Sequence, residues 1–77
     1  MSDLIEWLRP QYRDIRTLED GTIVATVDLM YTRAICLDLT RIGYGTRFCF
    51  EDRALADSEF AKLQTGDDEP VGFIARR

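Results

Sequence analysis

The residues of this chain that could do chemistry are carboxylates, arginines and two thiols, because the sequence contains no histidine. Histidine is the usual general base near neutral pH and the commonest metal ligand. Its absence also removes the serine–histidine and cysteine–histidine nucleophile pairs. Cys36 and Cys49 lack a second cysteine pair, so they match neither a zinc site nor a disulfide framework. We expect two free thiols, no catalytic residues, no metal and no cofactor.

The strongest signal in the sequence is its acidic charge. Fourteen acidic against ten basic residues give a net charge of -4, and segment 51–69 holds seven carboxylates against two cations. Three of these carboxylates follow a predicted helix at its C-terminal end, where the helix dipole disfavours negative charge. Helix stability therefore does not explain them, and the two interpretations are a solubilising loop tip and a surface complementary to a basic partner. We expect either a solubilising loop or a partner-binding surface made of Asp57, Glu59, Asp67, Asp68 and Glu69.

Two tyrosines add to this predicted partner-binding surface. Tyr31 and Tyr44 fall in predicted turns, with Arg33 and Arg47 close to them in the sequence. Tyrosine and arginine are enriched among the residues that dominate protein–protein binding energy. The two turns lie at opposite ends of one predicted strand, so a partner that touches both must span the sheet.

The N-terminal element is predicted from a cap and a breaker. Ser2 is a good N-cap for an amphipathic helix, and Pro10 should end that helix near Leu8 or Arg9. The following residues, 11–18, keep a helical spacing but precede an Asp-Gly hairpin signal. They therefore fit either a helix or a short strand over 13–18.

Two alternating segments, 23–30 and 34–41, predict neighbouring antiparallel strands. With 31–33 as the loop, Val27 faces Leu37 and the apolar sides match. A two-residue turn at 43–44 then places Leu39 opposite Phe48 in the next hairpin.

These registers predict a polar cluster on one face of the sheet. Asp38 would lie opposite Thr26, with Asp28 and Arg47 as diagonal neighbours. A carboxylate–guanidinium–carboxylate cluster of this kind could bind a ligand, and a solvated sheet surface is the alternative. The expected face consists of Thr26, Asp28, Cys36, Asp38, Thr40, Arg47 and Cys49.

The last elements complete a small α+β domain. Asp52 should cap a helix over 53–64, Gly66 should form a left-handed C-terminal cap, and 71–75 reads as a strand. We expect a single domain over 1–77 with a mainly antiparallel sheet of four to five strands and two helices on one face. The order is α-β-β-β-β-α-β, in which the first strand is the element whose assignment is left open.

Composition and exclusion indicate a small acidic, non-enzymatic protein that binds another protein. The N-terminus is not a secretory signal and no apolar run is long enough to span a membrane, so we expect a cytoplasmic chain without a membrane partner. Direct nucleic-acid binding is not expected at this net charge.

An acidic surface can occupy the basic nucleic-acid-binding surface of a partner and block its natural ligand. Small acidic proteins of this kind occur among phage and mobile-element inhibitors of bacterial defence systems, including the anti-CRISPR proteins. This likeness is one of size and charge, without a shared motif. One alternative is a self-associating accessory domain, such as a homodimer. The other is nucleic-acid binding through Arg13, Arg16, Arg41, Arg47, Arg76 and Arg77.

Overall fold

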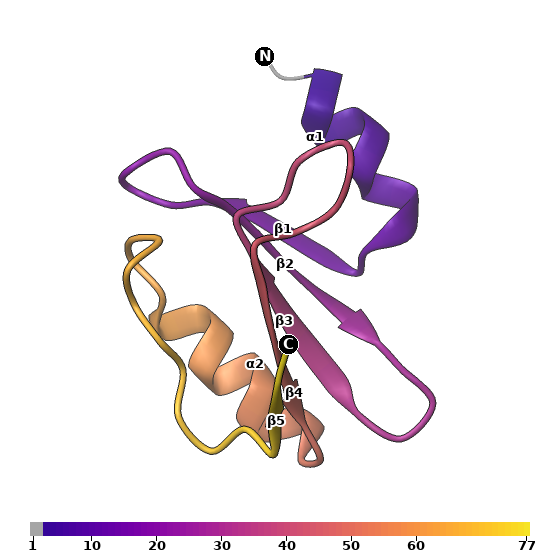
Figure 1. Cartoon of the computed structure of the whole chain (residues 1–77), viewed down its shortest axis with the longest axis vertical. Helices are drawn as coiled ribbons and strands as arrows, with labels where there is room; N and C mark the ends of the chain where they lie inside the picture. The colour runs from indigo at the N-terminus through magenta and orange to yellow at the C-terminus, as the bar shows by residue number, and fades with distance from the viewer. Residues whose placement is uncertain (1–2) are drawn as a thin grey trace.

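The structure is a computed structural model that describes residues 3–77, so the predicted N-cap Ser2 lies outside the described residues. Five antiparallel strands form one sheet in the order β1-β2-β3-β4-β5, which confirms the expected α+β class (Figure 1). A short 3-10 helix, η1, joins the first helix to the sheet. The elements are α1 (Asp3–Leu8), η1 (Arg9–Gln11), β1 (Asp14–Thr17), β2 (Ile23–Asp28), β3 (Arg33–Leu37), β4 (Thr46–Phe50), α2 (Arg53–Lys62) and β5 (Ala75–Arg76).

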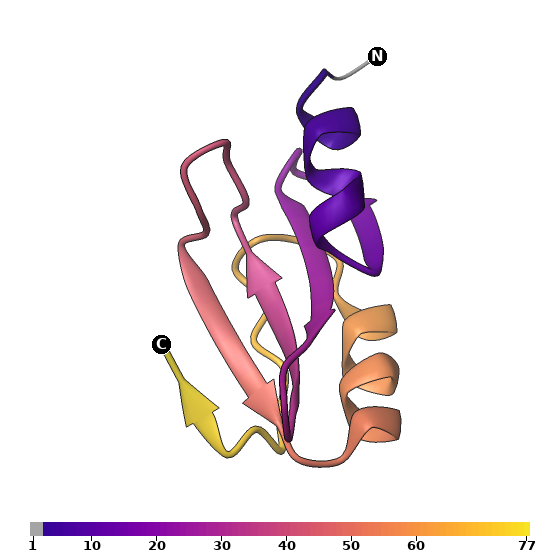
Figure 2. The ribbon, with the colours of Figure 1, turned by 90° about the vertical axis from the view of Figure 1, so that its right-hand side faces the viewer.

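The two helices cover opposite faces of the sheet, so the expectation of helices on one face is wrong. Phe60 of α2 packs in a cluster with Val24, whereas Leu8 of α1 packs with Ala25. Val24 and Ala25 are consecutive in β2, and consecutive strand residues point to opposite faces. Figure 1 shows α1 and α2 on either side of the strands, and Figure 2 shows β5 at one edge of the sheet.

The β2–β3 register differs from the predicted one by three residues. Val27 pairs with Ala34 instead of Leu37, because the turn comes earlier and Leu29 donates its N–H to the carbonyl of Thr32 over 2.8 Å. Both sheet faces are covered, and every residue from Ala34 to Leu37 is buried. Burial therefore favours neither face of this strand, and the apolar pattern could not select the register.

The β3–β4 hairpin also differs from the prediction. Leu37 pairs with Thr46, and the tight turn lies at residues 41–42, where Thr40 and Gly43 bond to each other through their backbones. Asp38 adopts a left-handed conformation with φ of 60°. That conformation interrupts the strand after Leu37, and the predicted pairing of Leu39 with Phe48 is lost.

Helix α2 begins as predicted but ends differently. The Asp52 carboxylate accepts hydrogen bonds from the N–H groups of Ala54 and Leu55 over 2.9 and 3.1 Å. The helix ends in extended backbone at Leu63 (φ -67°, ψ 134°). Gly66 is not among the glycines with positive φ, so the predicted left-handed cap is wrong.

The C-terminal end of α2 is satisfied by side chains from elsewhere in the chain. The Arg16 guanidinium donates to the carbonyl oxygens of Phe60 and Leu63 over 2.5 and 2.9 Å. The Asp68 carboxylate accepts from the N–H groups of Gln64 and Thr65 over 2.8 and 3.1 Å. Free carbonyl groups at the C-terminal end of a helix need donors, and here Arg16 of β1 supplies them. Asp68 instead fixes the two residues that follow the C-cap Leu63.

The two remaining assignments concern edge strands. Segment 11–18 was expected to be either a helix or a strand. The structure has both, because Gln11 ends η1 and residues 14–17 form β1. The last strand is Ala75–Arg76 instead of 71–75. The shift follows from Gly72, whose φ of 89° turns the chain before the strand begins. Within the described residues, no helix is long and apolar enough to cross a membrane.

Candidate protein-binding surface

The predicted cluster of Asp28, Asp38 and Arg47 does not form. In the observed registers Arg47 pairs with Cys36, which packs on the α1 side of the sheet. Asp28 pairs with Arg33 and faces the α2 side, and Asp38 has left the strand altogether. The three side chains are separated because both hairpin registers differ from those predicted.

A different charge cluster forms on the α2 side. Arg33 reaches Asp28 at 2.6 Å and Asp57 at 2.7 Å, and Arg13 reaches Asp57 at 3.2 Å. The hydrogen bond from Arg33 holds the pKa of Asp28 below its ordinary value. The network ties β3 and the residue before β1 to α2. Asp57 remains exposed, but its two oxygens are each engaged by an arginine of the same chain.

Glu59 was expected to belong to the partner-binding surface, but the structure places it inside the fold. Its side chain is buried, and it accepts hydrogen bonds from the Val71 N–H and the Lys62 ammonium, each over 3.0 Å. The bond from Val71, followed by that from Lys62, lowers the pKa of Glu59. The reason is tertiary, since the segment after α2 folds back along the helix and covers this carboxylate.

The carboxylates of the acidic loop after α2 also differ in whether their oxygens are engaged within the chain. Asp68 accepts hydrogen bonds from the N–H groups of Gln64 and Thr65, which follow the C-terminal end of α2. The carboxylates of Asp67 and Glu69 make no hydrogen bond or ion pair with any other residue in the range 3–77, and both residues are exposed. Only these two members of the predicted acidic surface keep their oxygens available to a partner.

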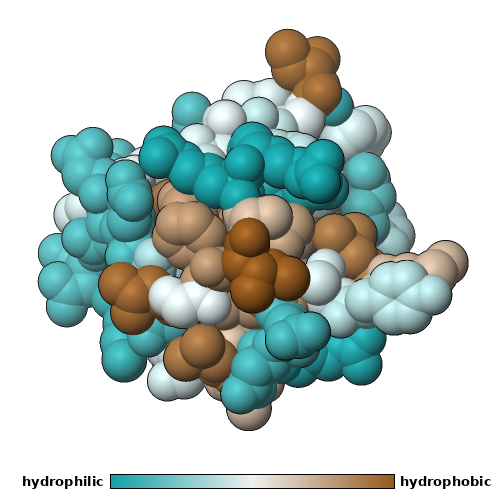
Figure 3. All heavy atoms as spheres, turned by 60° about the horizontal axis from the view of Figure 1, so that its bottom comes forward, coloured by the Kyte–Doolittle hydropathy of each residue, from teal (hydrophilic) through white to brown (hydrophobic). Residues whose placement is uncertain are grey.

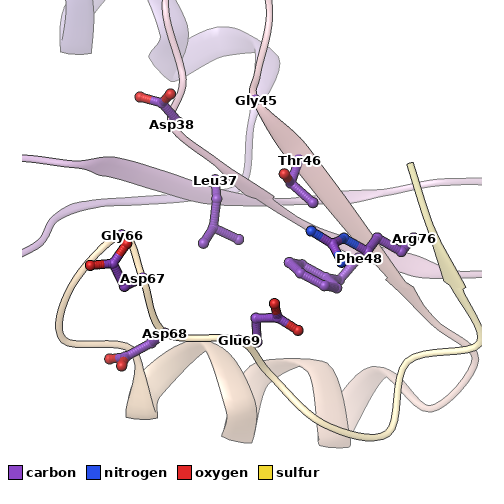
Figure 4. A pocket seen from close by; sticks show the side chains of 10 residues that line it. All are labelled: Leu37, Asp38, Gly45, Thr46, Phe48, Gly66, Asp67, Asp68, Glu69 and Arg76. Atoms are coloured by element: carbon purple, nitrogen blue, oxygen red, sulfur yellow. The ribbon is translucent and has the colours of Figure 1, made fainter.

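Asp67 and Glu69 line a pocket of about 310 Å³ between the loop and the sheet (Figure 4). Its floor includes the buried side chains of Leu37 and Phe48. Four carboxylates line it against one guanidinium. The lining residues are Leu37, Asp38, Gly45, Thr46, Phe48, Gly66, Asp67, Asp68, Glu69 and Arg76.

Asp38 and Arg76 are the pocket residues that sequence reasoning did not place there. A Cβ on Gly45 would lie 3.1 Å from the Asp38 Cβ, so glycine at this position leaves room for the Asp38 side chain. The Arg76 guanidinium lies over the Phe48 ring at 5.6 Å from its centroid. In Figure 4 the Glu69 carboxylate and the Arg76 guanidinium extend toward this ring from different sides. No local pattern links these residues, because the sheet and the returning loop bring them together.

The predicted tyrosines lie apart, at the two ends of β3. Tyr31 is 80% exposed in the β2–β3 turn, and its predicted neighbour Arg33 is engaged in the charge network. Tyr44 is 38% exposed and lies under the Arg47 guanidinium at 5.5 Å. As expected, one small partner cannot contact both tyrosines.

Apolar side chains gather at the end of the molecule shown in Figure 3. The segment before β5 and the β4–α2 connection lie at this end in Figure 1. Val71 and Ile74 of that segment are 66% and 61% exposed. Gly72 lies between them and packs closely against Leu55 of α2. The acidic loop is thus followed directly in the chain by exposed apolar residues.

Both cysteines are buried and free, as predicted. Their cross-strand partners are Arg47 for Cys36 and Ala34 for Cys49, so the two thiols are diagonal neighbours. Burial raises the pKa of Cys36 to about 11. A thiol of this kind is neutral at physiological pH and is a poor nucleophile.

Within residues 3–77, no group of three or more histidine, cysteine, aspartate or glutamate side chains is arranged to hold a metal ion. No protein-family model, curated protein or solved structure matches this chain.

Proposed function

We propose that this chain is a small non-enzymatic protein-binding protein whose acidic pocket receives a basic side chain of a partner. The observation that carries the proposal is the lining of that pocket, with carboxylates at its rim and Leu37 and Phe48 at its floor. Arginine and lysine bury an apolar stem while their charged head stays among polar groups. The apolar floor of the pocket can pack against the stem, and the carboxylates of the rim can bind the charged head.

Arg76 illustrates how the pocket accommodates such a group. Its guanidinium lies over Phe48, and among residues 3–77 it forms no ion pair with the carboxylates of the rim. The charge of Asp38, Asp67 and Glu69 therefore exceeds what the chain itself compensates. A partner's guanidinium would supply the missing positive charge and could stack on the same aromatic floor.

The adjoining apolar segment extends this surface. Val71 and Ile74 follow the acidic loop and are largely exposed. Protein-binding surfaces commonly combine an apolar centre with a charged rim. We infer a partner whose basic residues border an apolar strip.

Within this class, we propose that the partner surface is one that binds nucleic acid. Such surfaces carry clustered arginine and lysine, and the chain has a net charge of -4. Occupying that surface would exclude the nucleic acid, so the chain would act as an inhibitor. This is the role proposed by analogy with small acidic phage and mobile-element inhibitors of bacterial defence. The charge complementarity makes the association salt-sensitive.

The test compares three forms of the tagged chain in affinity capture from a bacterial lysate, with quantitative mass spectrometry at low and high salt. The pocket variant carries Asp38→Asn, Asp67→Asn and Glu69→Gln. Asparagine suits position 38 because it tolerates the left-handed conformation. The control variant removes the same number of charges at exposed positions outside the pocket lining, through Glu6→Gln, Glu19→Gln and Glu51→Gln.

We expect a nucleic-acid-binding protein that the wild type and the control retain at low salt and the pocket variant loses by about tenfold or more. With that protein purified, the chain should also displace its nucleic acid. Equal retention by the pocket variant contradicts the role of the pocket. Retention of the partner without displacement of nucleic acid contradicts inhibition and leaves protein binding supported.

A further inference from the structure

A second charged feature lies where β4 meets β5, on the sheet face opposite the acidic pocket. The backbone N–H and carbonyl groups of Arg47 and Arg77 bond to each other over 2.8 and 2.7 Å. The two arginines are therefore directly opposed on neighbouring strands, and their side chains leave the same face of the sheet. Like charges in this position destabilise a sheet, so folding gives no reason for the pair.

No carboxylate of the described chain compensates these two charges. Neither guanidinium forms an ion pair with residues 3–77, whereas Arg13 and Arg33 each reach a carboxylate. The Nε atom of Arg47 is the one buried side-chain nitrogen or oxygen of the described residues without a hydrogen-bond partner. Two positive charges thus leave the same sheet face without an ion-pair partner among residues 3–77, and one nitrogen of Arg47 lacks a hydrogen bond.

The surroundings of Arg47 hold its guanidinium in place. It lies over the Tyr44 ring, and its cross-strand partner Cys36 is buried. Tyr12 packs against the apolar cluster that contains Cys36. Tyrosine hydroxyls and guanidinium N–H groups are both donors to oxyanions. Of these two tyrosines, Tyr44 lies directly beside Arg47.

We propose that Arg47, Arg77 and Tyr44 form a binding site for a doubly charged phosphate group, either inorganic phosphate or a small phosphomonoester. Two guanidiniums match the charge of such a dianion, and each can donate two hydrogen bonds to its oxygens. A single carboxylate would compensate only one of the two positive charges. A nucleic-acid backbone carries one charge per phosphate and is repelled by the net charge of this chain. The site is separate from the acidic pocket and does not depend on its role.

The experiment is a titration of the full chain followed through the side-chain Nε–H resonance of Arg47 and the backbone amide resonances in ¹H–¹⁵N spectra. The probes are inorganic phosphate, glycerol phosphate, acetate and a short single-stranded oligonucleotide, each at constant ionic strength. The first two separate a free anion from an ester. The test variant is Arg77→Gln, which changes an exposed side chain. Arg53→Gln is the matched control, because this exposed arginine lies at the start of α2 and approaches only Asp28, at 4.0 Å.

We expect saturable shifts of the Arg47 resonance with phosphate or its ester, at a Kd of about 1 mM or below. Arg77→Gln should weaken this binding about tenfold or more, and Arg53→Gln should leave it unchanged. Shifts that do not saturate, or that both variants reduce equally, overturn the proposal. Saturation by acetate with equal affinity overturns the preference for a dianion. Tighter binding of the oligonucleotide, lost in Arg77→Gln, assigns the site to nucleic acid instead.

Discussion

At the scale of single residues, the carboxylates of segment 51–69 differ in what their oxygens accept. Asp52 and Asp68 accept backbone N–H groups at the two ends of α2, and Glu59 accepts a backbone N–H of the returning segment. Asp67 and Glu69 accept nothing from residues 3–77. Acidic residues of one short segment therefore bind backbone N–H groups, form ion pairs as Asp57 does, or remain available at the pocket as Asp67 and Glu69 do.

The first prediction concerns Glu59. Its folded-state pKa is depressed, so the ionised form contributes stability that is fully present above the ordinary glutamate pKa of about 4.3 and is lost as the pH falls below it. Glu59→Gln should lower the urea midpoint at neutral pH, and its difference from the wild type should shrink in acid. Other carboxylates titrate in both proteins, so the difference isolates Glu59.

The matched control for this prediction is Glu51→Gln, which changes an exposed carboxylate just before the cap of α2. It should leave the urea midpoint close to that of the wild type at every pH. A Glu59→Gln protein as stable as the wild type at neutral pH would contradict the structural role assigned to this carboxylate.

The second prediction concerns Cys36. Raising the pKa from 9.0 to about 11 reduces the thiolate fraction near pH 8 by about a hundredfold. Alkylation by iodoacetamide, followed by peptide mass spectrometry, should therefore be slower by at least this factor in the native chain than in urea. Equal rates in the two conditions would show that the thiol is not held in its buried position.

At the scale of elements, α2 is defined by partners outside its own sequence. Asp52 caps its beginning locally, whereas Arg16 of β1 binds the carbonyl groups at its end and stacks on Phe60 at 5.3 Å. Gly66 lies against the Thr22 side chain, with no room there for a Cβ. The glycine thus serves close packing of the loop instead of a left-handed cap.

The third prediction tests the N-terminal cap of α2. Asp52→Ala removes the acceptor for two backbone N–H groups and should lower the free energy of unfolding by about 1 kcal/mol. Chemical denaturation measures the change. Glu51→Ala, one residue earlier, makes no cap hydrogen bond and should stay within about 0.5 kcal/mol of the wild type. Equal losses in both variants would argue against the cap.

At the scale of the whole molecule, the sheet is covered on both faces. One apolar cluster joins the strands to α2 and a second joins them to α1. Strand β3 contributes to both, through Ile35 and Cys36 respectively. Because one strand serves both clusters, we expect the two layers to unfold together.

The fourth prediction tests this coupling. Leu8→Ala and Phe60→Ala remove buried side chains from the two clusters, and each should cost about 2–5 kcal/mol. Both variants should still unfold in one transition when helical and near-ultraviolet circular dichroism are compared. Ile42→Ala is the control, since Ile42 is 98% exposed and its loss should be near neutral. Separate transitions in the two signals would show that α1 is an independent layer.

Local chemistry was enough to predict most elements of this fold. A cap at Asp52, a breaker at Pro10 and alternating apolar residues act over a few positions, so the element order and the α+β class could be predicted from the sequence. The two free thiols were also predicted, and the observed β3–β4 register leaves Cys36 and Cys49 as diagonal neighbours.

The registers and the candidate site depended on tertiary structure. A sheet buried on one face selects its register through its apolar pattern, but this sheet is buried on both faces, so that pattern could not decide. Consequently Asp28 meets Arg33 instead of Arg47. Acidity near positions 67–69 was visible in the sequence. Which carboxylates remain available was decided when segment 64–74 folded back over α2, because that contact occupies Glu59 and leaves Glu69 at the pocket.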